Sequence, residues 1–303
     1  MTALRLLAPA KINLFLHIVG RRADGYHLLQ SAFELLDWSD TIHLTTRPES
    51  DIRREGDVIG ALDQDLAVRA ARALQSTTQW QGSSQPGVMI RVDKVIPAGA
   101  GLGGGSSDAA TTLYGLNRLW GLDLSAAQLA EIGLTLGADV PFFLFGRSAF
   151  AQGIGENLSP FNSIPRWVVV AVPACPVPTA RIFQSPELTR NSKPLKIADF
   201  AQAASHPVWD FGHNDLEPVT RALFPDVDLI LNWLSQAADC EGIAPEAVRM
   251  SGSGGAVFCT APDHQTARRV FHRLEEFQST AQGYRLAHLK LCQTLMTHPE
   301  RRS

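Results

Sequence analysis

The residues best suited to chemistry lie in the segment PAGAGLGGGSSDAA, Pro97–Ala110. Its glycines allow backbone N–H groups to turn inward around an anion, because no side chain stands in the way. A helix is expected to open at Ser106 or Ser107 and to aim its free N–H groups and dipole at the same point. The sequence therefore predicts a phosphate-binding cradle rather than a flexible linker, formed by Pro97, Ala98, Gly99, Ala100, Gly101, Leu102, Gly103, Gly104, Gly105, Ser106 and Ser107.

Two common phosphate sites with similar glycine patterns do not fit this loop. A P-loop requires a Gly-Lys pair followed by Ser or Thr, and the chain contains no Gly-Lys pair. Gly99–Gly104 does satisfy the GxGxxG pattern of nicotinamide-dependent dehydrogenases, and Asp123 follows about 20 residues later. However, Asp123 lies between two expected helices instead of after a second parallel strand, and Pro97 separates the preceding strand from the turn. A dehydrogenase is therefore not favoured.

Lone polar residues in two apolar segments are further candidates. Lys11 and Asn13 interrupt the apolar strand APAKINLFL, Ala8–Leu16, where burial without partners is costly. Asp139 stands among apolar residues in LGADVPFFL, just past the end of an expected helix. Each also has a structural interpretation: Lys11 would face solvent from an edge strand, and Asp139 would bond its own turn. By themselves these residues leave both interpretations open.

A second glycine turn, MSGSGGAVF, occupies Met250–Phe258 between two apolar strands. As a hairpin it needs no further function, whereas as a second backbone lining of a phosphate pocket it would account for its many glycines. The sequence does not decide between the two. Nearby, Asn214 with Glu217 three residues later is typical of a helix cap rather than of a ligand.

The elements around these motifs mix helices with strands. Strands are predicted where branched and aromatic side chains cluster, and helices where apolar residues recur at helical spacing. The predicted strands are Leu4–Leu7, Ile12–Val19, Thr41–Thr45, Val88–Val92, Trp167–Val172, Ala247–Met250, Ala256–Thr260 and Tyr284–Leu291. The predicted helices run from a capping Asp65 to Leu74, from Ser106 or Ser107 to about Leu119, from a capping Ser125 to near Gly137, and over Asn214–Leu223, Asp226–Ala238 and Asp263–Phe277.

These elements do not alternate as regular βαβ units, which indicates an α+β fold. Prolines between Pro160 and Pro178 punctuate the chain around the strand at Trp167–Val172. We therefore expect an N-terminal lobe at residues 1–164, which carries the phosphate loop, and a C-terminal lobe at residues 165–303.

Composition limits the partners. A net charge of −3 gives no general attraction for nucleic acid or for an anionic membrane, so we expect neither as a partner. The four cysteines form no CxxC pair, which disfavours a zinc site or a disulfide framework and suits reduced thiols in the cytoplasm. Lys11 and Asn13 interrupt the apolar start, which is therefore expected to be a strand and not a signal peptide.

Taken in order, the lysine-bearing strand, the glycine loop and the late glycine turn resemble the three signature motifs of the GHMP kinases. Within that superfamily, other segments are similar to the diphosphocytidyl-methylerythritol kinases. They are GRRADGYHLLQS (Gly20–Ser31), TLGADVPFFL, GIGE (Gly153–Glu156), PTARIF (Pro178–Phe183) and Asn214-Asp215. The resemblance runs from about Leu7 to Phe258, and nothing is carried over to the stretch after Phe277.

The resemblance implies a two-lobed GHMP-kinase fold and a phosphoryl transfer from ATP with Mg²⁺. The acceptor would be the tertiary 2-hydroxyl of a methylerythritol unit linked to CDP, in the non-mevalonate route to isoprenoids. Asp139 would be the base and Lys11 would keep its carboxylate ionised and offset charge on the transferring group. No residue is assigned to the metal, since Glu156 is better interpreted as a surface glutamate.

By the same resemblance, Tyr26, His27 and Phe183 would surround the cytosine ring, and Asn13 would touch substrate from the face that carries Lys11. Two alternatives remain at this stage. One is another GHMP kinase, of the homoserine or mevalonate type, and the other is a non-catalytic nucleotide sensor. The aromatic and imidazole side chains of the DGYH segment favour a pyrimidine-linked substrate over the first alternative, and the presence of both Lys11 and Asp139 disfavours the second. The sequence predicts no oligomeric state.

Overall fold

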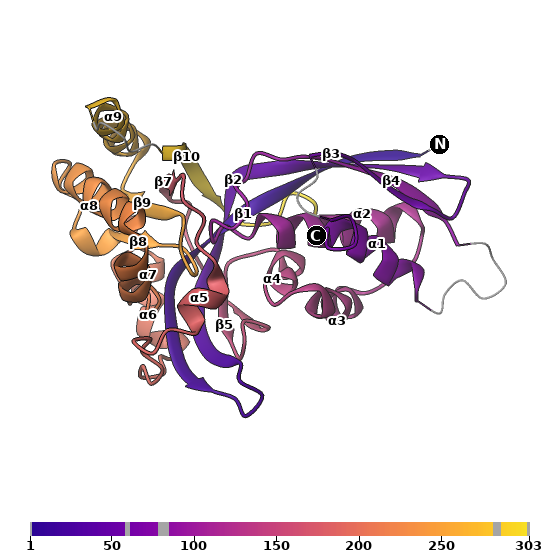
Figure 1. Ribbon diagram of the computed structural model, residues 1–303, viewed down its shortest axis with the longest axis horizontal. Coiled ribbons are helices and arrows are strands. Elements are labelled where there is room, and N and C mark those ends of the chain that lie inside the picture. The colour runs from indigo at the N-terminus through magenta and orange to yellow at the C-terminus, as the bar shows by residue number, and fades with distance from the viewer. Residues whose placement is uncertain (1, 58–60, 78–84, 281–285, 302–303) are drawn as a thin grey trace.

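The computed structural model describes residues 2–57, 61–77, 85–280 and 286–301. Across these ranges no helix is both long enough and apolar enough to cross a lipid bilayer. Strands and helices are mixed without regular alternation, which confirms the α+β prediction. They form two lobes, one at each side of Figure 1, and a long pair of strands passes between them.

This pair is an antiparallel hairpin of β1 (Ala3–Arg21) and β2 (His27–Arg47). Every residue of β1 from Ala8 to Ile18 is buried, so its polar side chains need partners inside the protein. The prediction of two separate strands at Leu4–Leu7 and Ile12–Val19 is wrong, because β1 is continuous. The pairing register shifts just after Pro9, which has no N–H to donate, and the strand continues through this irregularity.

The predicted strand at Thr41–Thr45 is only the end of β2. The earlier part of β2 was missed because acidic residues such as Glu34 interrupt its apolar pattern. Glu34 is fully buried there and pairs with Arg166 at 2.6 Å across the junction of the lobes. A tertiary ion pair therefore allows a charge where a period-two pattern predicts an apolar side chain.

The sheet has the strand order β3-β4-β2-β10-β7-β9-β8, while β1 pairs with β2, and β5 and β6 extend from β2. The bounds of the strands beyond the hairpin are Ile52–Gly56 for β3, Gly87–Asp93 for β4, Ala149–Gln152 for β5, Asn157–Pro160 for β6, Trp167–Pro173 for β7, Val248–Met250 for β8, Val257–Ala261 for β9 and Leu286–Leu295 for β10. The strands predicted at β4, β7, β8 and β9 are confirmed to within a residue or two. The strand predicted at Tyr284–Leu291 starts outside the described residues and continues further, to Leu295.

Four helices pack on the first half of the sheet, on the right of Figure 1: α1 (Leu66–Gln75), α2 (Gly104–Leu119), α3 (Ala126–Leu136) and α4 (Val140–Phe145). The caps predicted for two of them are confirmed. Asp65 accepts from the N–H groups of Ala67 and Val68, and Ser125 forms a capping box with Gln128.

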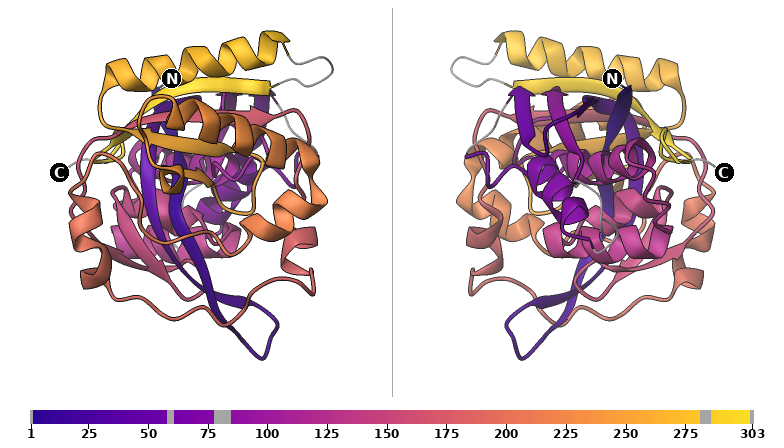
Figure 2. Two further views of the ribbon diagram at one scale, coloured as in Figure 1. Left: turned by 90° about the vertical axis from the view of Figure 1, so that its left-hand side faces the viewer. Right: turned by 90° about the vertical axis from the view of Figure 1, so that its right-hand side faces the viewer.

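The second half contributes α5 (Thr179–Phe183), α6 (Ile197–Ala204), α7 (Glu217–Leu223), α8 (Pro225–Asp239), a 3₁₀ turn at Pro245–Ala247 and α9 (His264–Thr280). α8 and α9 pack together, and Figure 2 shows α9 lying along β10. The helices predicted at α8 and α9 are confirmed. α7 begins three residues later than predicted, at Glu217, for a reason given below.

The chain returns to the first lobe at its end. Thr294 and Leu295 pair with Leu36 and Leu35 of β2, and the N–H of His298 donates to Gly146 O at 2.8 Å. β7 starts two residues after the expected division between residues 164 and 165. Because residues 294–301 pack back across this point, the assignment of residues 1–164 and 165–303 to separate lobes stays a prediction.

Candidate active site

The glycine loop has an alternating backbone. Gly99, Gly101 and Gly103 have φ angles of 68°, 77° and 71°, whereas Ala100 and Leu102 between them are not among the residues with positive φ. The side chains of Ala100 and Leu102 are buried in the core between the lobes and anchor the loop. Alternation of this kind brings successive backbone N–H groups to one side, where they form a concave site for an anion. The loop geometry therefore supports the predicted phosphate cradle.

The helix after the loop begins earlier than predicted. α2 starts at Gly104 with Gly103 as its N-cap, and among the described residues no side chain caps its first turn. The expectation that Ser106 or Ser107 opens the helix is therefore wrong, since a left-handed glycine ends the loop instead. The N–H groups of this first turn stay available to a ligand. Ser107 is fully buried inside α2, and its hydroxyl bonds to no described residue.

The second glycine turn lies directly against the first loop. The hydroxyl of Ser251 donates to Gly101 O at 2.9 Å, and Ala256 N donates to Ala100 O at 2.8 Å. A Cβ on Gly101 would lie 2.2 Å from Ser251 O, so only glycine permits this approach. Of the two interpretations that the sequence left open, the structure favours a second backbone lining.

Asn214 holds this second turn in place. Its Nδ2 donates to Met250 O at 2.9 Å and to Gly252 O at 2.8 Å, and its Oδ1 accepts from Leu216 N at 3.0 Å. The predicted cap with Glu217 is therefore wrong in detail. Asn214 bonds a distant turn, so the helix starts after it, with Leu216 at the N-cap.

Lys11 and Asp139 meet beside the cradle. Lys11 Nζ lies 3.6 Å from Asp139 Oδ2, and the lysine is buried whereas 37% of the aspartate side chain is exposed. Asp139 precedes α4 but makes no side-chain bond to that helix. Both structural interpretations left open by the sequence are therefore disfavoured, because Lys11 does not face solvent and Asp139 does not bond its own turn. The pair has an exposed carboxylate and a buried ammonium, which suits acid–base chemistry on a ligand.

Lys11 is held by a chain of buried hydrogen bonds. Its Nζ donates to Asn13 Oδ1, and Asn13 Nδ2 donates to Ser31 Oγ at 2.9 Å. Ser31 in turn donates to Phe15 O at 2.5 Å. A serine that donates to a carbonyl must accept from the amide, which fixes which end of Asn13 faces Lys11. The predicted substrate residue Asn13 thus also positions Lys11, and Ser31 was not foreseen.

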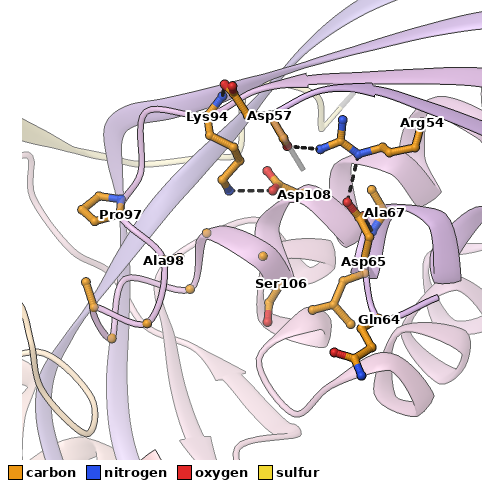
Figure 3. A pocket seen from close by; sticks show the side chains of 17 residues that line it. Arg54, Asp57, Gln64, Asp65, Ala67, Lys94, Pro97, Ala98, Ser106 and Asp108 are labelled. Carbon is orange, nitrogen blue, oxygen red and sulfur yellow. Dashed lines mark hydrogen bonds and ion pairs between the residues drawn. The ribbon is translucent and has the colours of Figure 1, made fainter. Parts of the chain in front are cut away.

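Two cavities open on either side of the cradle. One, of about 330 Å³, is bounded by Pro97–Gly101, the start of α2 and the N-terminal end of α1 (Figure 3). The other, of about 340 Å³, is lined by Lys11, Asn13, Asp139 and Phe183 among others. Gly101, Gly103 and Ser106 line both cavities. Ligands bound in the two cavities would therefore meet at the cradle, where a group could be transferred from one to the other.

Charged residues that the sequence did not single out surround the first cavity. Lys94 Nζ lies 2.7 Å from Asp108 Oδ2 and 2.5 Å from Asp40 Oδ2. Burial alone would lower the pKa of Lys94, but the carboxylates of Asp108 and Asp40 outweigh it and raise the pKa. Burial raises the pKa of Asp108 to about 7, against the pull of Lys94. At the other end, Arg54 donates to Asp65 at 2.9 Å (Figure 3). The sequence contained one indication that Lys94 lies at this site, because it precedes the glycine loop by only three residues.

The predicted base-binding residues are only partly brought together. The rings of His27 and Phe183 lie 5.1 Å apart, although one comes from β2 and the other from α5. Tyr26 is 61% exposed in the β1–β2 turn and is in ring contact with neither. Arg190, which the sequence did not indicate, donates to His27 Nε2 at 3.1 Å.

Glu156 is used within its own turn, where its carboxylate accepts from Ile154 N at 2.6 Å. This geometry favours the structural interpretation of that glutamate. Within residues 2–57, 61–77, 85–280 and 286–301, no three or more His, Cys, Asp or Glu side chains are grouped so that they could hold a metal ion.

A two-lobed α+β fold with a glycine cradle between two cavities is that of a small-molecule kinase of the GHMP type. The GHMP kinases N terminal domain matches residues 65–147, and the GHMP kinases C terminal domain matches residues 199–279. A solved homoserine kinase from Cytophaga hutchinsonii is 14% identical with a TM-score of 0.69, covering 98% of this chain and 96% of its own. That likeness shows the shared fold.

More similar proteins define the family within this class. A 4-diphosphocytidyl-2-C-methyl-D-erythritol kinase from Cupriavidus metallidurans is 51% identical over 268 residues, which cover 88% of this chain and 87% of the relative. One from Thiobacillus denitrificans is 50% identical over 278 residues, 91% of this chain and 92% of the relative. A solved 4-(cytidine 5'-diphospho)-2C-methyl-D-erythritol kinase is 34% identical with a TM-score of 0.75, and the match covers 96% of this chain and 99% of the other. The chain belongs to the family of 4-diphosphocytidyl-2-C-methyl-D-erythritol kinases.

Proposed function

We propose that this kinase transfers the γ-phosphoryl group of ATP to the 2-hydroxyl of 4-diphosphocytidyl-2-C-methyl-D-erythritol. The observation that carries the proposal is the shared wall: Gly101, Gly103 and Ser106 line both cavities, and Lys11 and Asp139 lie beside that wall. In-line transfer needs the donor and the acceptor on opposite sides of one phosphoryl position, which this arrangement offers.

ATP would lie in the 330 Å³ cavity with its phosphates on the cradle. A Cβ on Gly99 would meet no atom within 4 Å, so the loop leaves open space on the side of this cavity. The backbone N–H groups of the loop and of the first turn of α2 would bind the phosphate oxygens. Pro97, Ala98, Gly104 and Gly105 complete the lining, whereas Leu102 and Ser107 support it from the core.

In the transfer itself, Asp139 Oδ2 takes the proton of the acceptor hydroxyl as its oxygen bonds to the γ-phosphorus. The bond from the γ-phosphorus to the bridging oxygen breaks, and ADP leaves with the electron pair of that bond on the oxygen. Lys11, at 3.6 Å from that carboxylate, offsets negative charge on the transferring group. A tertiary alcohol is hindered and weakly acidic, so a positioned base contributes a large part of the rate.

Magnesium would accompany the ATP. In sites of this kind Mg²⁺ uses phosphate oxygens, waters and one or two protein oxygens instead of a full protein cage. The lining of the 330 Å³ cavity includes the side-chain oxygens of Ser106 and Asp108, which are of the type that this ion prefers. The ion would supply neutralisation of charge on the phosphates, and no protein ligand is assigned to it.

The cytidine end of the acceptor would lie toward His27 and Phe183. Phe183 lines the 340 Å³ cavity that also contains Lys11 and Asp139, so one extended ligand could contact both regions. A flat base stacks on an aromatic ring, which is worth about 1–3 kcal/mol. Tyr26, which is 61% exposed in the adjacent hairpin turn, would contact the other face of the base.

The proposal is tested by ATP consumption with a panel of acceptors. We expect turnover with 4-diphosphocytidyl-2-C-methyl-D-erythritol and at least 100-fold lower kcat/KM with methylerythritol alone, with homoserine and with mevalonate, an estimate that combines stacking with loss of the diphosphate contacts. Equal use of a bare polyol and its CDP conjugate would refute the substrate assignment. ³¹P NMR of the product distinguishes a phosphate on the 2-hydroxyl from one on another hydroxyl.

The base-binding residues are tested separately. Phe183→Ala and Tyr26→Ala should each raise KM for the CDP-linked substrate by about 10- to 100-fold, with KM for ATP nearly unchanged. Phe271→Ala, which removes a partly buried aromatic ring from α9, is the control for general loss of packing. A rise in KM for ATP of the same size would indicate damage to the fold instead of loss of stacking.

A further inference from the structure

Arg190 joins the two sides of the predicted base-binding region. Its Nε donates to His27 Nε2 at 3.1 Å. Its Nη1 donates to Leu188 O at 3.0 Å, and its Nη2 donates to Phe183 O at 3.3 Å and Ser185 O at 2.7 Å. One guanidinium thus binds the main chain that carries Phe183 and the side chain of His27 from β2. The three bonds to main-chain carbonyls shape the loop, whereas the bond to His27 affects the protonation of an imidazole ring.

The bond to His27 sets the tautomer of that ring. A guanidinium can only donate, so Nε2 of His27 must be the unprotonated nitrogen and the neutral ring carries its proton on Nδ1. Burial, followed by the charges of Arg190 and Arg21, holds the pKa of His27 below its ordinary value of 6.5. The ring is therefore neutral near pH 7. Within the described part of the chain no group accepts from the Nδ1–H, and the residue is only partly buried.

A fixed donor distinguishes the two common pyrimidines. Cytosine has an unprotonated N3 that accepts a hydrogen bond, whereas N3 of uracil carries a proton and donates. An Nδ1–H donor matches cytosine and opposes an N3–H, and the other tautomer would reverse this preference. Stacking against Phe183 cannot supply the difference, because every base has a flat face.

We propose that Arg190 is a specificity-determining residue, which selects cytosine over uracil by holding His27 in the Nδ1–H form. The proposal rests on the proposed function, because it assumes that the base of the acceptor lies against His27. Arg190 is a positioning residue: it acts through His27 and touches neither the reacting hydroxyl nor the phosphoryl group.

The kinetic test compares the CDP-linked and UDP-linked acceptors in Arg190 variants. Arg190→Met removes the donor and the charge, and Arg190→Lys keeps a charge without the planar fork. We expect Arg190→Met to reduce the preference for the CDP conjugate by about 10- to 100-fold, with KM for ATP unchanged, because the loss of one buried polar match has that effect. The preference of Arg190→Lys for the CDP conjugate should lie between that of the wild type and that of Arg190→Met. Arg181→Met is the matched control, since Arg181 is an exposed arginine on α5 that packs over Phe224 and should leave the preference as it is.

The spectroscopic test observes the tautomer without any substrate. Long-range ¹⁵N–¹H spectra of histidine-labelled enzyme identify which ring nitrogen carries the proton, and His27→Gln assigns the signal. The wild type should show the Nδ1–H form, and Arg190→Met should show a mixture with the Nε2–H form and a higher pKa, because a nearby positive charge is gone. A merely structural arginine would change neither.

The outcomes separate this proposal from the one on which it rests. A wild type in the Nε2–H form, or an Arg190→Met variant that keeps the full preference for cytosine, overturns the role of Arg190. If the wild type phosphorylated no cytidine conjugate, the proposed function would fail. The spectra would still decide whether Arg190 sets the tautomer. Circular dichroism melts of each variant exclude unfolding as the cause, and Arg190→Lys supplies a second variant if Arg190→Met is unstable.

Discussion

Ser31 offers a sharp test of how the proposed catalytic lysine is held. This serine is fully buried on β2, lines neither cavity, and is connected to the site only through Asn13. The hydroxyl accepts from Asn13 Nδ2 at 2.9 Å and donates to Phe15 O at 2.5 Å. Ser31→Ala removes both bonds and leaves a small change in volume. We therefore expect a loss of turnover from a residue that touches no substrate.

The magnitude follows from the groups left behind. Without the hydroxyl, a buried amide N–H has no acceptor, which lowers the free energy of unfolding by about 1–3 kcal/mol. If Asn13 turns its amide over to recover a bond, its N–H groups face the ammonium of Lys11 and two donors meet. A hydrogen bond to a charged group is worth about 1.5–3 kcal/mol, so its loss in the transition state lowers kcat by about 10- to 100-fold.

Steady-state kinetics with ATP and the CDP-linked acceptor measure this effect. KM for ATP should stay unchanged because the nucleotide cavity is separate, and Ser31→Thr should restore most of kcat because it keeps a hydroxyl. Ser39→Ala, a half-buried serine on the same strand, controls for strand packing. The reasoning is refuted if Ser31→Ala keeps kcat within twofold of wild type while its melting temperature shows that the site is folded.

Asp139→Asn should lower kcat by about 10²- to 10⁴-fold, the range for loss of a positioned base. Lys11→Met should be comparably damaging, and because the two charges lie 3.6 Å apart the double variant should lose little more, as single- and double-mutant rates will show. Gly99→Ala should raise KM for ATP about tenfold while KM for the acceptor stays constant. The added Cβ meets no protein atom within 4 Å, and a strain of about 1–2 kcal/mol at φ 68° is its cost to the fold. An equal rise in both KM values would count against the cradle. Asp108, whose pKa is raised from 3.8 to about 7, keeps a proton in the folded state that the unfolded chain releases, so its stabilising effect is complete below pH 3.8 and is lost as pH rises through about 7. In the wild type this loss lowers the free energy of unfolding by up to about 1.4 kcal/mol per pH unit, and Asp108→Asn should remove that contribution to the decline in urea melts from pH 5 to 7. Asp63→Asn, on the surface, is the control and should leave the decline unchanged.

Local signals predicted those parts of the fold that local chemistry determines. Asp65 and Ser125 cap the helices expected of them, because a cap depends on residues within one turn. The strand at Trp167–Val172 was recognisable because a run of branched side chains is typical of a buried strand. The earlier part of β2 was not recognisable, because Glu34 lies inside it and its partner Arg166 is distant in sequence. Such a partner is invisible to any window of neighbouring residues.

The candidate site divides in the same way. The cradle was predicted from its glycines, because glycine is the residue that readily adopts the positive φ angles that the loop requires. Ser31 and Arg190 were missed because nothing in their immediate surroundings marks them, and Lys94 was missed although it precedes the glycine loop by three residues. Each acts on a residue far along the chain, as Arg190 acts on His27, and only the fold brings such pairs together. Resemblance to a family transfers the residues of a motif but not the residues that hold them.

The three glycine-rich and lysine-bearing segments form one hydrogen-bonded unit rather than three separate motifs. Lys11 N donates to Leu102 O at 2.9 Å, and Asn13 N donates to Ser251 Oγ at 3.2 Å. Ser251 in turn donates to Gly101 O. The strand that carries Lys11 is therefore placed by the main chain of the cradle, and a shift in the cradle must move the lysine. It follows that substitutions at this junction should alter kcat and both KM values together. Separate effects on the two substrates should arise only from residues outside it, such as Gly99 on the nucleotide side and Phe183 on the acceptor side.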